Sequence, residues 1–107
     1  MDSWSPAAVE VAAYRICQEA LMNVRTHSQA RRVRVRLSAG ASLELRVEDD
    51  GVGVRRVRPG GVGLASMRER AIEVGGECVV EDGAWDDGSH GTTVRATLPL
   101  HGHEERA

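Results

Sequence analysis

Several residue types are scarce or absent in this sequence, and each absence narrows the possible structures. The 107 residues include no phenylalanine, and the aromatic residues are limited to Trp4, Tyr14 and Trp85. A core must therefore be built mainly from Val, Leu, Ala and Ile, and a Val-rich core favours a β-sheet. Lysine is also absent, since all 14 basic residues are arginine, which we attribute to codon usage and not to function.

Charge, apolar runs and cysteines exclude further classes of protein. A net charge of -2 gives no electrostatic footprint for nucleic acid. No apolar run approaches the roughly 20 residues of a membrane helix, and no signal peptide is visible. Cys17 and Cys78 lack the spacing of a metal site or redox pair, so we expect free thiols in a reducing compartment. We predict a cytoplasmic segment that contacts neither nucleic acid nor a membrane.

Hydrophobic periodicity divides the chain into helices and strands. Ser5-Pro6 is typical of a helix start, and apolar residues at helical spacing predict a helix over residues 6–28. Opposite them, a polar stripe runs through Arg15, Glu19, Asn23 and His27. Alternation predicts two half-buried strands, 33–37 and 43–48, joined as a hairpin.

The second half of the chain repeats this order. We expect a helix over residues 64–74, then strands at 77–81 and 92–98 around a turn-rich segment, 82–91. The polar tail from His101 onward is expected to be disordered. This order predicts one α+β domain over residues 1–107: a two-layer sandwich whose mixed, mostly antiparallel sheet has helices on one face.

Three segments could bind a ligand, although each has an ordinary structural explanation. Asp50-Gly51 after a strand is also a hairpin-turn signature. The glycines of segment 60–63 precede a helix, where backbone N–H groups can hold phosphate, but such a segment can equally be a flexible loop. Glu19 and Asn23 suit a general base and a Mg²⁺ ligand, yet polar pairs on helices are usually just solvated. Only their combination predicts a nucleotide site.

The combination closely resembles the histidine kinase ATPase family. Its motifs match, in order, segments 14–23 (YRICQEALMN), 47–53 (VEDDGVG), 61–71 (GVGLASMRERA) and Gly91-Thr92 with a terminal Leu98-Pro99. The match covers residues of about 7 to 100, and the third segment is similar to the subgroup that includes the nitrate sensor and the membrane-fluidity thermosensor. The resemblance implies the ATPase fold shared with gyrase, Hsp90 and the mismatch-repair ATPases.

Family roles carry over to the matching positions only as implications of the resemblance. Asp49 would contact adenine, with Gly51 and Gly53 shaping the pocket, while Asn23 would bind the Mg²⁺ that bridges the ATP phosphates. Glu19 would orient or deprotonate the attacking group. Gly61 and Gly63 would line the phosphate side, Thr92 would support Asp49, and His27 would touch a phosphate. Leu64 would also contact ATP. The implied activity is phosphoryl transfer to a histidine on a separate dimerisation domain, which then serves a response regulator in a two-component system.

This sequence departs from the family pattern in three places. Thr26 stands where the family commonly has Lys or Arg, which predicts weaker phosphate binding. A strand usually precedes the first helix, so an unpaired sheet edge is expected here. None of the four histidines lies in a dimerisation helix pair, so the chain alone is not expected to autophosphorylate. Two alternatives therefore stay open: a non-catalytic nucleotide-binding or interaction module, and a serine kinase of the anti-sigma-factor type. A membrane anchor elsewhere in the parent kinase also stays open.

Overall fold

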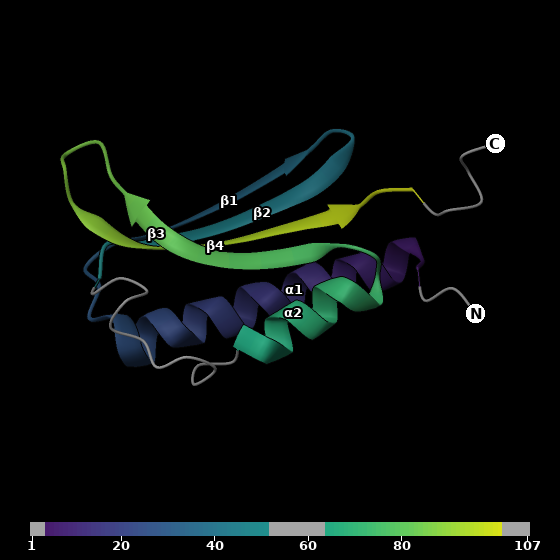
Figure 1. The fold of residues 1–107 in the computed structure, drawn as a ribbon, viewed down its shortest axis with the longest axis horizontal. Coiled ribbons are helices and arrows are strands. Elements are labelled where there is room, and N and C mark those ends of the chain that lie inside the picture. The colour runs from purple at the N-terminus through teal and green to yellow at the C-terminus, as the bar shows by residue number, and fades with distance from the viewer. Residues whose placement is uncertain (1–3, 52–63, 102–107) are drawn as a thin grey trace.

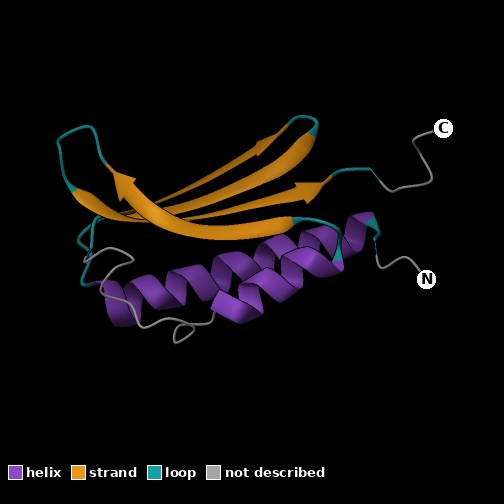
Figure 2. Ribbon diagram, in the orientation of Figure 1, coloured by secondary structure: helices purple, strands orange, loops and turns teal. Residues whose placement is uncertain are grey.

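The computed structural model describes residues 4–51 and 64–101, except for the side chains of residues 27 and 28. The elements occur in the order α1 (Pro6–Asn23), a π-helix η1 (Val24–Ser28), β1 (Val33–Ala39), β2 (Ser42–Asp49), α2 (Leu64–Glu73), β3 (Glu77–Ala84) and β4 (His90–Pro99). The helices form one layer and the sheet the other (Figures 1 and 2). The predicted α+β sandwich is confirmed.

The first helix begins and is buried as its sequence indicates. The Ser5 side chain accepts a hydrogen bond from the Ala8 N–H, and Pro6 occupies the first turn, where its missing N–H costs nothing. The buried side chains recur at helical spacing: Val9, Ala12, Ile16 and Ala20. The regular α-helix ends at Asn23 and continues as a π-helix, which stops at Gln29 with a left-handed φ of 57°.

The sheet has the strand order β1-β2-β4-β3, and each neighbouring pair is antiparallel. The described residues contain no parallel pair, so the expected mixed sheet is not observed there. Inward residues face each other across the central strands, with Leu45 opposite Ala96 and Val47 opposite Val94. The outer face is polar, and its ion pairs include Arg34 with Glu48, whose Nε and Oε1 atoms lie 2.8 Å apart.

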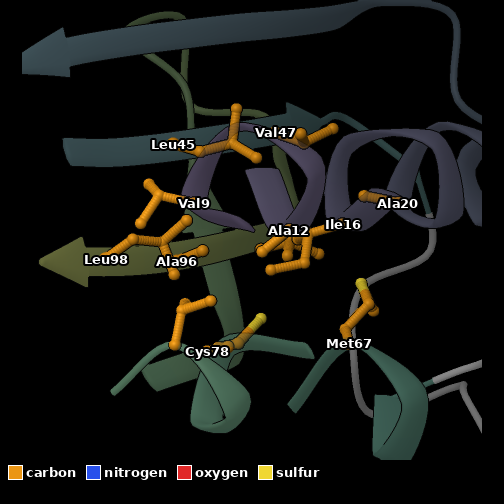
Figure 3. Packing of buried hydrophobic residues seen from close by; sticks show 13 residues of the cluster. Val9, Ala12, Ile16, Ala20, Leu45, Val47, Met67, Cys78, Ala96 and Leu98 are labelled. Carbon is orange, nitrogen blue, oxygen red and sulfur yellow. The ribbon is translucent and has the colours of Figure 1, made fainter. Parts of the chain in front are cut away.

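The core lies between the central strands and both helices. Its largest fully buried side chains are Ile16, Met67, Leu98 and Val47 (Figure 3). Cys78 is buried in this cluster and Cys17 packs against it, and both thiols are free, as predicted. Burial raises the pKa of both thiols. No helix among the described residues is long and apolar enough to cross a membrane.

Two predicted details of the strands are wrong. Strand β1 lies at the sheet edge, where Val33, Val35 and Leu37 are exposed instead of half-buried, because they project beyond the part of the sheet packed against the helices. The predicted turn-rich segment 82–91 is too long, since the turn covers only residues 85–89, because the β3–β4 ladder continues as far as Ala84 opposite His90. Local preference of Asp and Gly for turns is overridden by this pairing.

Candidate functional site

Asp49 ends strand β2 and points into the helix layer. It continues the inward row formed by Leu45 and Val47, and its exposed fraction is only 4%. The Gly51 N–H donates to Asp49 Oδ1 at 2.8 Å. Burial raises the pKa of the carboxyl group above its ordinary value of 3.8, although hydrogen bonds from the Gly51 and Thr92 backbones oppose the rise. The result is a buried acceptor fixed at the end of the core.

The neighbouring carboxylate, Asp50, has a structural role. Its Oδ1 accepts from the backbone N–H groups of Arg31 and Arg32, both at 2.9 Å, and its Oδ2 accepts from Arg32 Nε at 2.8 Å. These contacts, led by the Arg32 side chain, lower the pKa of Asp50 to about 2. Asp50 therefore ties the beginning of β1 to the end of β2, which leaves Asp49 as the carboxylate that faces the helices.

Strand β4 approaches Asp49 very closely. Thr92 lies directly opposite Asp49 and is half-buried, on the same sheet face as Val94. At Gly91, an added Cβ would overlap the Asp49 carbonyl oxygen and come within 2.6 Å of the carbonyl carbon. Only glycine fits here, so the glycine of the Gly-Thr motif allows β4 to place Thr92 beside Asp49.

Helix α1 brings Glu19 and Asn23 to this same end of the sandwich. Its beginning is fixed near the end of β4, because the Trp4 indole N–H donates to the Pro99 carbonyl at 3.0 Å. Its 18 residues span about 27 Å, close to the length of a strand of 10 residues. In Figure 3, Val9 lies toward Leu98 and Ala20 toward Val47. Asn23, the last residue of α1, is therefore at the Asp49 end.

The predicted polar stripe on the first helix is regular only as far as Asn23. Glu19 and Asn23 are one α-helical turn apart and half-buried. His27 lies in the π-helix, whose wider turns no longer repeat the four-residue spacing, so the stripe does not extend regularly to it. Its side chain is outside the described residues. Arg25 and Thr26 are both exposed.

The glycine-rich segment cannot be placed. Gly53, Gly61 and Gly63 lie outside the described residues. The role of Gly53 in shaping the adenine pocket and the phosphate-side role of Gly61 and Gly63 stay predictions. Gly51 is the last described residue before this segment and Leu64 the first after it. Leu64 begins α2 and packs against the core.

Trp85, to which no motif in the sequence gives a role, directly contacts the site. Its indole Nε1 donates to the Asp49 carbonyl at 3.2 Å. This contact joins residues 36 positions apart, and no local pattern around Trp85 announces it. The feature of the sequence that could have drawn attention to Trp85 is the rarity of aromatic residues in this chain.

Comparison with known proteins is decisive for the family. The family described as histidine kinase-, DNA gyrase B-, and HSP90-like ATPase matches residues 8–102. The chain belongs to this family. Among its curated relatives, Sensor histidine kinase LiaS of Bacillus subtilis (strain 168) is 38% identical over 97% of this chain and 29% of the relative. Signal transduction histidine-protein kinase/phosphatase DegS of Brevibacillus brevis is 32% identical over 89% of this chain and 24% of its own length. The ATPase domain thus spans less than a third of these relatives.

Proposed function

We propose that this ATPase domain binds Mg-ATP and transfers its γ-phosphoryl group to a histidine on a separate dimerisation domain of a cytoplasmic kinase module, which then serves a response regulator. The observation that supports this proposal is the gathering of four motif residues at one end of the sandwich. The sheet contributes Asp49 and Thr92, and helix α1 contributes Glu19 and Asn23. The relatives named above are both described as histidine kinases.

The buried Asp49 suits recognition of adenine. An ionised carboxylate only accepts hydrogen bonds, and the exocyclic amine of adenine donates them. Asp49 Oδ1 already accepts from Gly51, so the strand end holds the carboxylate in one orientation before a ligand arrives. In a buried position such a bond is strong and selective, because an unpaired carboxylate there is costly.

The donor chemistry also fits Mg²⁺. Described residues contain no cluster of three His, Cys, Asp or Glu side chains that could enclose a metal by themselves. Mg²⁺ commonly takes few protein ligands and completes its shell with phosphate oxygens and water, so the amide oxygen of Asn23 is a suitable single ligand. When bound, the ion would neutralise charge on the phosphates.

Glu19 would act on the attacking group. It lies one helical turn before Asn23, on the same side of α1 and half-buried. A carboxylate here would orient the acceptor imidazole and accept its proton as the phosphoryl group arrives. The histidine itself belongs to another domain, so the role of this chain is to position and to stabilise charge.

One observation favours a second function, that of a nucleotide-binding module without transfer. Thr26 is exposed where the family commonly has a cation. Transfer of labelled phosphate to a matched histidine-bearing dimerisation domain separates the two functions. Mg-ATP binding without label on that histidine would establish the binding module. The serine-kinase alternative would instead label a serine of an anti-sigma-factor antagonist.

Calorimetric titration with millimolar Mg-ATP tests binding itself. Asp49→Asn should weaken affinity about ten- to hundredfold, since one charge-assisted hydrogen bond is lost. Glu44→Gln is the matched control, because it removes a carboxylate from the polar face of the same strand, where Glu44 pairs with Arg46 at 3.5 Å. Wild-type protein that shows no heat with Mg-ATP would contradict the proposed function, and equal affinity in both variants would remove Asp49 from the site.

A further inference from the structure

The turn between β3 and β4 places an indole ring against the end of β2. The turn is closed by two backbone bonds, from the Trp85 N–H to the Ser89 carbonyl at 2.8 Å and from the Gly88 N–H to the Trp85 carbonyl at 2.9 Å. From this turn the Trp85 side chain reaches the Asp49 carbonyl, to which Nε1 donates at 3.2 Å. The indole is therefore held by a hydrogen-bonded turn at one end and by strand β2 at the other.

Two arginines, Arg32 just before β1 and Arg34 within it, hold the ring in place. The guanidinium carbons of Arg32 and Arg34 lie 4.4 and 4.6 Å from the Trp85 ring centroid, within the range of cation–π attraction. Arg32 also donates to Asp50 Oδ2 at 2.8 Å and to Ser89 Oγ at 3.1 Å, and it pairs with Asp87 Oδ2 at 3.0 Å. Arg32 thus links the end of β2, through Asp50, to the β3–β4 turn, through Asp87 and Ser89.

The consequence falls on Asp49. It is the last residue of its strand, and strand ends fray unless other groups hold them. Here the Gly91 backbone of β4 lies so close to the Asp49 carbonyl that no Cβ fits between them, the Trp85 indole N–H donates to that carbonyl, and the Gly51 N–H donates to the carboxylate. A displacement of about 1 Å in a binding group is enough to reduce function severely.

We propose that Trp85 is a positioning residue, which holds the Asp49 main chain so that its carboxylate meets the purine amine of a bound adenine nucleotide. This inference rests on the proposed function for its ligand. Trp85 itself lies behind the strand and need not touch the nucleotide. Arg32 supports it by orienting the ring.

The two tryptophans offer a matched pair of variants. Trp85→Phe and Trp4→Phe each remove one indole-to-carbonyl hydrogen bond and keep an aromatic ring, but Trp4 bonds Pro99 at the opposite end of β4. We expect Trp85→Phe to weaken Mg-ATP affinity about three- to tenfold, the worth of one neutral hydrogen bond. Trp4→Phe should lower stability similarly and leave affinity unchanged. Trp85→Leu should weaken Mg-ATP binding further. If the Trp85→Leu protein does not fold, Trp85→Phe alone decides the test.

A second readout requires no nucleotide. The amide proton resonance of Gly51 reports its hydrogen bond to Asp49 Oδ1, which is 2.8 Å long. In nucleotide-free protein this resonance should move upfield in Trp85→Phe and stay in place in Trp4→Phe. If the wild type binds no Mg-ATP, the proposed function fails, and the Gly51 resonance still decides whether Trp85 positions Asp49. If the wild type binds, equal affinity and an equal Gly51 resonance in both variants would overturn this inference alone.

Discussion

A single methyl group added at Gly91 would test how tightly β4 must approach the site. In Gly91→Ala the new carbon would overlap the Asp49 carbonyl oxygen and lie 2.6 Å from its carbon and 2.8 Å from Asp50 Cα. All of these atoms are backbone, so no side chain can rotate to relieve the overlap. The strands must separate at the residue that faces the proposed nucleotide.

The magnitude follows from this geometry. Overpacking of this kind costs about 1–3 kcal/mol. For a domain of this size each kcal/mol lowers Tm by about 4 °C, so a loss of roughly 4–12 °C is expected. Displacement of Asp49 should also weaken Mg-ATP binding about tenfold or more, because the hydrogen bond to adenine depends on its position.

Scanning calorimetry with and without Mg-ATP measures both effects, since a ligand raises Tm according to its affinity. Gly40→Ala is the control. Nothing lies within 4 Å of a Cβ added at Gly40, which is exposed in the turn between β1 and β2, so its effect should stay within about 0.5 kcal/mol. Tm and affinity that are equal in the two alanine variants would refute the argument that β4 is in tight contact with Asp49.

Four further predictions concern polar and charged groups at the Asp49 end of the sandwich. Asn23→Ala should lose Mg²⁺-dependent affinity in calorimetry, whereas Glu19→Gln should keep most affinity but slow phosphate labelling of the partner histidine by about 10²-fold; equal labelling rates would remove the proposed role of Glu19. Because the pKa of Asp50 falls to about 2, its stabilising contribution is complete above its ordinary 3.8 and is lost as pH falls toward 2, so Asp50→Asn should flatten this part of the unfolding profile. Because the pKa of Asp49 is raised, its contribution is complete below 3.8 and is lost as pH rises through the higher folded value, so Asp49→Asn should gain stability relative to wild type between pH 3 and 7. If the difference in unfolding free energy between Asp49→Asn and wild type stayed constant across that pH range, the Asp49 carboxylate would not be desolvated.

The order and type of the elements could be predicted because the signals are local. Ser5-Pro6 and the apolar spacing of α1 each indicate a helix start without tertiary information. Strand alternation also indicates that Asp49 shares the inward face of Leu45 and Val47, while Asp50 does not. Periodicity alone therefore separates these two carboxylates.

The errors arose where distant residues decide the conformation. Asp82 and Gly83 read as a turn, but pairing with Thr92 and Gly91 extends the strands through them. The change to a π-helix after Asn23 alters the spacing to His27, and no residue in that segment signals it. The contact of Trp85 with Asp49 depends on the curvature of a hairpin, which the sequence of the hairpin does not state.

The hydrogen bond between Trp4 and Pro99 holds the beginning and the end of the described fold together. These residues are 95 positions apart, yet the indole nitrogen and the carbonyl oxygen are 3.0 Å apart, so the start of α1 and the end of β4 lie on the same side of the molecule (Figure 1). A short linker could therefore join the sequence after β4 to the sequence before α1, and new termini could be made elsewhere in the chain. The exposed turn at Gly40 is a suitable opening, because it lies outside the core and away from Asp49. A circular permutant that begins at Ala41 and ends at Gly40 should thus fold to the same sandwich, with its nucleotide end unchanged.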